Sequence, residues 1–376
     1  MAKEEDKNFS EKDEVILSPT QQIRIKFKNN RLAMIGFYMF VTIVLLVVVT
    51  HFYTKFTGYD FAKTDPTIRN NPPSWAHPFG TDKYGRDTFM RVLEGGWISL
   101  QVGFLSTFMA ITIGLTMGAI AGFFSGRVDN IIMRLIEILS SFPFLAIAYT
   151  ISAIFREEAP EFRLYVIVII LGFLSWTGLA RLIRGQILAL REQEFIVATR
   201  ALGIKRRNQI LRHLVPNVLP TVVVSATLTF AYSILNEAFL SFLNLSVTEP
   251  IPTWGALLSK AAENSTSLRT FWWIWVFPGT MLFLFIMSIN LIGEGLRDSI
   301  DPKAEYTTKK QRKEAYKRAH EIRQFEIQLF WTRGTYYWAF ILAAFTAHFA
   351  LLSSLFNAER YPFSLCNVYS LPRLSL

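Results

Sequence analysis

The sequence has 376 residues, of which 51% are hydrophobic and only 18% are charged, and its mean hydropathy is +0.29. This composition indicates a membrane-embedded chain. The net charge is +10, and the single cysteine, Cys366, excludes an intrachain disulfide and offers no cysteine spacing for zinc.

The apolar residues gather in windows long enough to cross a membrane. A hydrocarbon core of about 30 Å needs roughly 20 apolar residues in a helix. Six such windows lie in the body of the chain and a seventh candidate lies in its tail, so we expect an all-α integral membrane protein. The windows are approximately 32–50, 98–124, 131–155, 164–180, 219–240 and 271–292, with 336–356 in the tail.

The segment 1–31 is expected to be cytoplasmic and not to be a cleavable signal peptide. Residues 1–28 are polar, and the apolar run that follows is long enough to remain as a span. Near its end apolar residues alternate with basic ones, which predicts an interfacial anchor rather than a domain: Ile23, Arg24, Ile25, Lys26, Phe27 and Lys28.

The segment 51–97 is expected to form an outer loop that leads into a helix. Its prolines favour an extended backbone, and Thr81 or Asp82 is the expected helix cap. Asp82, Arg86 and Asp87 are expected to satisfy one another in an ordered extracellular turn.

Two pairs of polar residues within the apolar windows are candidates for specific roles. Arg134 and Glu137 are three residues apart on one expected helix, which predicts a mutual ion pair near the cytoplasmic end of the third span rather than a proton relay. Asn236 and Glu237 lie near the outer end of the fifth span. Intramembrane polar groups are functional candidates by default, so this pair is expected to line a pathway or to contact a partner subunit.

The segment 194–220 lies between two long apolar runs and reads as a basic helix-turn-helix. Phe195, Ala198, Thr199 and Leu202 share one helical face, and Gly203 stands where a left-handed cap would turn the chain. We interpret the pair as a docking loop. A helix pair that lies on lipid headgroups with its arginines toward anionic lipid is the alternative.

A second short helix is expected to follow Gly203. Arg207, Ile210, Leu211 and Leu214 repeat the helical spacing. Pro216 is expected to end the turn, because proline cannot donate a backbone hydrogen bond.

Lysine and arginine are banded along the chain. They concentrate between the fourth and fifth windows and after the sixth, whereas the intervening outer segments hold few. Short basic loops stay in the cytoplasm, which places the N-terminus, the docking loop and the segment after the sixth span inside. A nucleic-acid surface would need stacking aromatics among its arginines, and these loops have almost none.

The tail holds three expected parts. Residues 304–335 predict a charged cytoplasmic connector. Residues 336–356 are long enough to form a seventh transmembrane helix, which would leave 357–376 outside. A helix that lies against the membrane face is the alternative for 336–356.

Several blocks resemble one family. Val197, Ala198 and Thr199 stand where the cytoplasmic loop signature of ABC importer permeases has Glu-Ala-Ala, and Ala198 and Gly203 match it. HPFGTDKYGRD at 77–87, NEAFLSFLNL at 236–245, PTWGALLSKA at 252–261 and the closing block 271–303 are similar to C-type permeases of the dipeptide, oligopeptide and nickel importers. The tail after 303 departs from that family.

The resemblance implies a six-helix ABC importer transmembrane domain over 32–303, with a docking loop at 184–218. It implies a bacterial-type cytoplasmic membrane, a homologous second permease, two cytoplasmic ATPases and an extracytoplasmic solute-binding protein that delivers peptides. The chain would be non-catalytic and bind no metal or cofactor, because it has no GxxxxGK[ST] loop and ATP and Mg would sit on the partner ATPases.

The resemblance also assigns residues to two contact regions. The ATPase-docking residues it implies are Glu194, Val197, Ala198, Thr199, Leu202, Gly203, Ile210, His213 and Pro216. The residues it implies for contact with the binding protein are Asp82, Arg86, Asp87 and Trp254.

Two alternatives remain at this point. A permease of the same family could import nickel chelates or other small solutes. An ion-coupled secondary transporter would be expected to show repeated halves with midplane carboxylates, and neither is visible in the sequence. An enzyme is disfavoured because the histidines are scattered and none lies in an HExxH arrangement.

Overall fold

The computed structural model describes residues 19–246, 250–262 and 270–300. The chain divides into two units, Met1–Asp301 and Pro302–Leu376, and all the described residues lie in the first. The expected connector at 304–335, the seventh helix at 336–356 and the tail at 357–376 lie outside the described residues.

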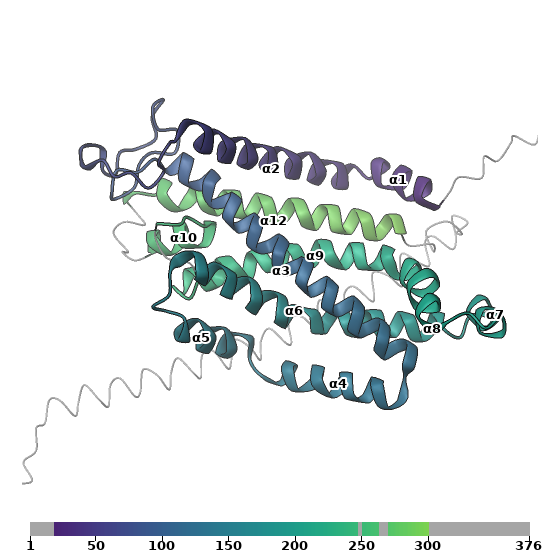
Figure 1. The fold of residues 1–376 in the computed structure, drawn as a ribbon. Coiled ribbons are helices and arrows are strands. Elements are labelled where there is room, and N and C mark those ends of the chain that lie inside the picture. The colour runs from purple at the N-terminus through teal and green to yellow at the C-terminus, as the bar shows by residue number, and fades with distance from the viewer. Residues whose placement is uncertain (1–18, 247–249, 263–269, 301–376) are drawn as a thin grey trace, which may run out of the picture. The chain divides into compact units, whose positions relative to one another are not determined.

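The described residues fold into helices joined by loops, with one antiparallel bridge between Thr81 and Asp87 (Figure 1). This confirms the expected all-α class. In chain order the elements are α1 (Pro19–Asn29), α2 (Arg31–Thr57), the 3-10 turn η1 (Pro66–Ile68), α3 (Thr88–Phe124), α4 (Gly126–Ser141), α5 (Phe144–Ile154), α6 (Pro160–Leu190), α7 (Glu194–Ala201), α8 (Arg206–Asn208), the π-helical turn η2 (Gln209–Leu214), α9 (Val215–Phe242), α10 (Trp254–Ala262) and α12 (Trp273–Ile300).

Within the described ranges, five helices are long and apolar enough to cross a membrane: α2, α3, α6, the continuous helix Arg206–Phe242, and α12. The pair formed by α4 and α5 is the sixth candidate, and its two helices meet at 78°. The third span expected at 131–155 therefore corresponds to a broken pair of helices and not to one continuous helix. Phe142 has an extended backbone (φ −86°, ψ 135°), because the ring of the following Pro143 disfavours the helical conformation there.

α3 runs through the middle of the helix bundle and packs most extensively against α6. Its contact face carries Gly114, Gly118 and Gly122, one turn apart. A Cβ on Gly118 would lie 2.6 Å from the carbonyl oxygen of Ala180, and one on Gly122 would lie 2.8 Å from the Cβ of Ile187. Glycine therefore lets the two backbones approach closely, which is how membrane helices gain packing energy without a hydrophobic driving force.

A second contact joins α12 to α2 and α9. Gly36 on α2 faces the backbone of α12, where a Cβ would lie 2.8 Å from the carbonyl oxygen of Ser288. Val47, Ile234 and Phe285 are fully buried between these helices. α2 and α12, which are far apart in the sequence, thus pack together and against α9.

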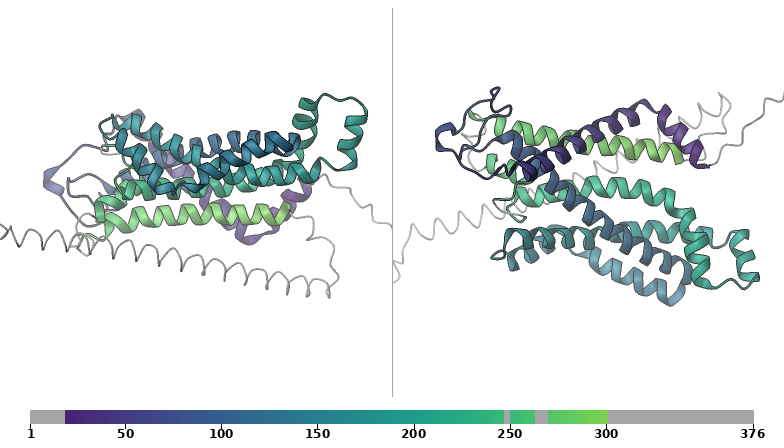
Figure 2. Two further views of the ribbon diagram at one scale, coloured as in Figure 1. Left: turned by 90° about the horizontal axis from the view of Figure 1, so that it is seen from below. Right: turned by 45° about the horizontal axis from the view of Figure 1, so that its top comes forward.

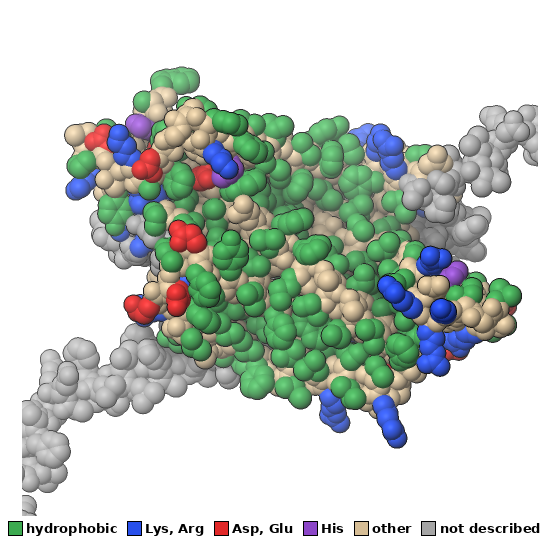
Figure 3. Space-filling model, viewed as in Figure 1, with side chains coloured by type: hydrophobic (Ala, Val, Ile, Leu, Met, Phe, Trp, Pro, Cys, Tyr) green, Lys and Arg blue, Asp and Glu red, His purple; other side chains and the backbone are tan. Residues whose placement is uncertain are grey.

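The two ends of the bundle differ. α1, α7 and α8 lie at one end, and the outer loop and α10 lie at the opposite end (Figure 2). On the face in Figure 3, lysine and arginine gather at the α7 and α8 end, the opposite end carries most of the acidic residues, and apolar side chains cover the surface between. The exposed apolar residues of the membrane-spanning helices include Phe37, Phe104, Phe108, Ile131 and Tyr165, as expected for a surface that faces lipid or a second membrane subunit.

Candidate functional site

The first half of the docking loop is α7, and its apolar stripe is mostly exposed. Phe195 is 42% exposed and Leu202 is 79% exposed. Only Ile196, which is fully buried, and Thr199 turn toward the rest of the protein. Of the predicted face, Phe195, Ala198 and Leu202 point away from the bundle, whereas Thr199 is buried against it. The three exposed residues leave an apolar surface for another molecule.

Gly203 closes α7 with a left-handed backbone, φ +69°. The N–H of Gly203 donates to the carbonyl of Arg200 at 3.0 Å, and the N–H of Ile204 donates to that of Thr199 at 3.1 Å. These two bonds form a complete Schellman motif. The left-handed turn predicted at Gly203 is confirmed, and it fixes the angle at which the chain leaves α7.

The second half of the loop differs from the expectation. α8 runs through η2 directly into α9, so Pro216 lies within the continuous helix Arg206–Phe242, at the start of its α9 part, and does not end a helix. The N–H of Val215 donates to the carbonyl of Ile210, five residues earlier, which is the wider π spacing. The π turn immediately before Pro216 interrupts the regular hydrogen-bond ladder, and such an interruption is a common place for a bend in a helix. His213 is half-buried in this turn, and its carbonyl accepts a 2.6 Å bond from Asn217 Nδ2.

Two arginines near the end of α6 join it to the neighbouring helices α3 and α4, next to the point where the docking loop begins. Arg184 Nε and Nη2 donate to Asp129 Oδ1 and Oδ2 at 2.5 and 2.6 Å, a bidentate ion pair. Arg191 Nη1 donates to the carbonyls of Gly122 and Phe123 at 3.4 and 3.3 Å. Arg184 had been assigned to the loop at 184–218, but α6 extends to Leu190, so the loop begins later than expected.

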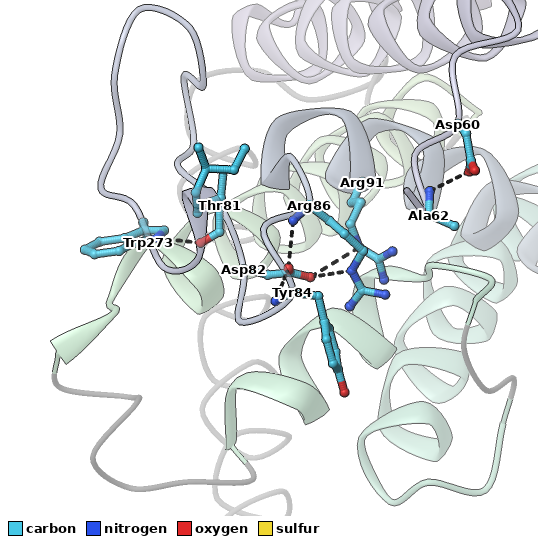
Figure 4. A network of polar contacts seen from close by, with 9 residues as sticks. Asp60, Ala62, Thr81, Asp82, Tyr84, Arg86, Arg91 and Trp273 are labelled. Carbon is cyan, nitrogen blue, oxygen red and sulfur yellow. Dashed lines mark hydrogen bonds and ion pairs between the residues drawn. The ribbon is translucent and has the colours of Figure 1, made fainter. Parts of the chain in front are cut away.

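In the outer loop, Asp82 forms the centre of a polar network (Figure 4). Its Oδ2 is 2.7 Å from Arg86 Nε and 4.0 Å from Arg91 Nε. Its Oδ1 accepts from the backbone N–H of Tyr84 and of Arg86 at 2.8 and 3.0 Å. The expected pairing of Asp82 with Arg86 is confirmed.

Asp87 has a different role from the one expected. Its Oδ1 accepts from the N–H of Met90 at 3.0 Å, so Asp87, and not Thr81 or Asp82, caps α3. Its Oδ2 is 2.7 Å from His77 Nδ1. A carboxylate at a helix N-terminus is also favoured by the helix dipole, which explains why the helix begins one residue after Asp87.

Trp254 is fully buried, at 0% exposure. Its Nε1 donates to the carbonyl of Val92 at 2.9 Å, and its backbone N–H bonds Ser99 Oγ at 3.3 Å. Its side chain therefore joins α10 to α3. The expectation that this side chain contacts a binding protein at the surface is contradicted, because an aromatic ring in the core cannot reach a partner.

Glu237 is also fully enclosed, at 0% exposure. Ser241 Oγ donates to its Oε1 at 2.7 Å, and Ser99 Oγ donates to its Oε2 at 3.2 Å. The carboxylate thus finds its donors within this chain and does not face outward to a pathway or a partner subunit. Its neighbour Asn236 is half-buried.

The predicted pair of Arg134 and Glu137 is confirmed, with Nη1 and Oε2 3.1 Å apart and side chains 81% and 64% exposed. Another pair escaped sequence reasoning. His51 Nδ1 lies 2.8 Å from Glu94 Oε1, and the His51 ring stacks on Trp97 with centroids 4.3 Å apart. No local signal could indicate it, because the partners are 43 residues apart in the sequence.

The chain matches known families along most of its length. Residues 114–306 match the family described as binding-protein-dependent transport system inner membrane component. Residues 18–73 match the N-terminal transmembrane domain of oligopeptide transport permease C. Residues 313–371 match the octameric membrane protein family, so the departure of the tail coincides with similarity to a second family.

Individual relatives agree with these matches. The oligopeptide transport system permease protein OppC of Escherichia coli K12 is 40% identical over 299 residues, which is 79% of this chain and 95% of that protein. OppC of Haemophilus influenzae is 39% identical over 285 residues, 75% of this chain and 88% of that protein. The dipeptide transport system permease protein DppC of Alkalihalophilus pseudofirmus is 37% identical over 287 residues, 76% of this chain and 91% of that protein.

Proposed function

Because this chain belongs to the family of binding-protein-dependent transport system inner membrane components, we propose that it is a permease subunit of an ATP-driven peptide importer. It supplies half of the translocation pathway for dipeptides or oligopeptides. The observation that carries this proposal is the 40% identity to an oligopeptide permease over 299 residues, a stretch that covers 79% of the chain.

The energy for transport comes from other subunits in this proposal. The sequence contains no GxxxxGK[ST] phosphate loop, so two cytoplasmic ATPases bind ATP and Mg and this chain is non-catalytic. A homologous second permease completes the pathway. The assembly lies in the cytoplasmic membrane, with the N-terminus and the docking loop inside.

The docking loop is the proposed ATPase contact. Phe195, Val197 and Leu202 form its exposed apolar surface, and Gly203 sets its angle. The anchoring pair of Arg184 and Asp129 supports rigid transmission, since a bidentate ion pair resists reorientation. Closure of the ATPases would then move α6 and α9, which flank the loop, as rigid bodies. Glu194, Ile210, His213 and Pro216 complete the proposed contact region.

The outer loop is the proposed contact for the binding protein. Trp75 is fully exposed there, in a loop that the Asp82 network and Asp87 hold in place. Arg86 is only 7% exposed, so it lies below this surface and supports the conformation of the loop. Asn236 remains a candidate for contact with the second permease or the pathway, and residues 304–356 remain a proposed connector and seventh span.

The proposal is tested by purifying the chain from its native membrane in mild detergent and measuring the mass of the intact assembly. We expect one different permease and two ATPase subunits for each copy of this chain. Recovery of this chain alone or as a homo-oligomer, while a second known multi-subunit complex of the same membrane survives solubilisation, would contradict the proposal and favour an ion-coupled carrier.

A further inference from the structure

A basic cavity lies beside the docking loop, and Gly203 is the one residue of the proposed ATPase contact that lines it. It is open to solvent, has a volume of ≈ 530 Å³, and lies between the end of α3 and the turn that joins α7 to α8. The lining residues that matter below are Phe123, Phe124, Arg191, Arg200, Arg206 and Gln209.

The cavity carries an excess of positive charge. Three arginines line it and no acidic residue does. Arg191 is held by Glu192 Oε1 at 2.8 Å and by the end of α3. Arg200 Nη2 donates to the carbonyl of Arg191 at 3.3 Å, and Arg206 has no ion pair within the part of the chain that the structure describes. An anion would relieve this charge excess.

The side chain of Gln209 indicates that the anion should also carry a hydrogen-bond donor. Its side chain belongs to a residue that is only 3% exposed, and its Nε2 donates to the carbonyl of Ile204 at 2.8 Å. Its Oε1 is buried and, among the described residues, has no hydrogen-bond partner. A buried acceptor without a donor costs about 1–3 kcal/mol. A ligand that offers hydroxyl donors beside its negative charge would satisfy both Gln209 and the arginines.

The position of the cavity points to a membrane lipid. Phe123 and Phe124 are the last two residues of α3, a span, and Phe124 is 42% exposed. The end of an apolar span lies close to the depth of the lipid headgroups. A basic pocket at that depth suits an anionic headgroup, while the aromatic rings suit the start of its acyl chains.

We propose that the cavity binds the headgroup of phosphatidylglycerol, an anionic phospholipid with hydroxyl donors. The phosphate accepts from Arg200 and Arg206, and a headgroup hydroxyl donates to Gln209 Oε1. Because Arg200 precedes Gly203 and Arg206 follows it, the lipid bridges both sides of the turn that closes α7. A zwitterionic ethanolamine headgroup would bring its ammonium group against three arginines.

The test is native mass spectrometry of the purified full-length chain in mild detergent. The chain is titrated with phosphatidylglycerol and with phosphatidylethanolamine of the same acyl chains. We expect retained phosphatidylglycerol and weak binding of phosphatidylethanolamine. In the double variant Arg200→Gln with Arg206→Gln, the affinity for phosphatidylglycerol should fall about thirtyfold. This fold-change corresponds to a loss of roughly 1 kcal/mol of binding free energy for each arginine removed.

A matched control separates the cavity from the charge of the loop. Arg207 and Arg212 are exposed on the same loop and do not line the cavity. The double variant Arg207→Gln with Arg212→Gln loses the same charge and should keep its affinity for phosphatidylglycerol. An equal loss in both double variants would overturn the proposal, because it would show only nonspecific attraction to an anionic lipid.

Two further experiments distinguish the lipid from other possible occupants of the cavity. Inorganic phosphate is added to the lipid-bound chain, and displacement that depends on Arg200 and Arg206 would identify a free-anion site and overturn the lipid assignment. The intact assembly is then measured in the same way. Retention of phosphatidylglycerol supports the proposal, and its loss only when the ATPases are present would show that acidic ATPase groups occupy the cavity instead.

Discussion

At Gly203 the backbone has φ +69°, and no other atom lies within 4 Å of the position that a Cβ would occupy. A substitution there meets no steric clash within this chain, so its effect on the fold comes through the backbone conformation. We predict that Gly203→Val keeps expression and membrane insertion but loses the coupling of ATP hydrolysis to uptake, because a β-branched residue disfavours the left-handed turn by about 1–3 kcal/mol. Peptide-stimulated ATPase activity of the purified assembly measures this.

The matched control for Gly203 is Gly58, the C-cap of α2 at the opposite end of the bundle. It has φ +67° and equally open surroundings. Gly58→Val imposes the same backbone cost away from the docking loop and should keep its coupling. Equal coupling in the two variants would remove Gly203 from the docking assignment.

The buried hydrogen-bond network of Glu237 should contribute more to stability than the exposed ion pair of Glu137. Glu237→Ala leaves the hydroxyls of Ser99 and Ser241 without their acceptor, which should destabilise the chain by about 1–3 kcal/mol. Glu137→Ala removes the exposed pair with Arg134, which is worth about 0–1 kcal/mol. Thermal unfolding in mild detergent should therefore show a clear decrease in the midpoint for Glu237→Ala only. Similar midpoints would mean that the Glu237 network contributes little to stability.

At the scale of elements, the close approach of α3 and α6 depends on glycine. Gly118→Ala places a Cβ 2.6 Å from the carbonyl oxygen of Ala180, and overpacking of this kind typically costs about 1–3 kcal/mol. Gly178→Ala on α6 places a Cβ where no atom lies within 4 Å, so it should be neutral or gain up to about 1 kcal/mol of helix propensity. Unfolding midpoints that rise for both variants would contradict the packing argument.

Local sequence patterns predicted correctly those elements that depend only on nearby residues. Apolar length identified the spans, because a hydrocarbon core demands it whatever the partners are. The left-handed turn was found at Gly203 because glycine is the usual residue in that conformation. The break before Pro143 was missed, although its signal is local, because the apolar window continues across it.

Nonlocal contacts could not be predicted in this way. The pairing of Arg184 with Asp129 joins residues 55 positions apart, and that of Ser99 with Glu237 joins residues 138 apart. Trp254 looked like a surface residue of an outer segment, yet α10 folds back onto α3 and buries it. Only the packing of the helices decides which side chains meet.

At the scale of the whole molecule, the two ends of the bundle differ in charge (Figure 3), and the basic end is assigned to the cytoplasm. The orientation can be measured with single cysteines, each introduced into a Cys366→Ser variant that has no other thiol. Trp75→Cys, in the fully exposed outer loop, should react with a membrane-impermeant maleimide in intact cells. Lys205→Cys, exposed in the docking loop, should react only after permeabilisation. The reverse pattern would invert the assigned orientation.

The central claim is that this chain couples ATP hydrolysis elsewhere to peptide movement through itself. Uptake of a labelled oligopeptide by proteoliposomes tests it most directly, with the intact assembly in the membrane, ATP and the cytoplasmic face inside, and the binding protein outside. We predict uptake that requires both ATP and the binding protein and that disappears in Gly203→Val. Uptake driven by a proton gradient without ATP, or uptake of a nickel chelate but of no peptide, would contradict the account.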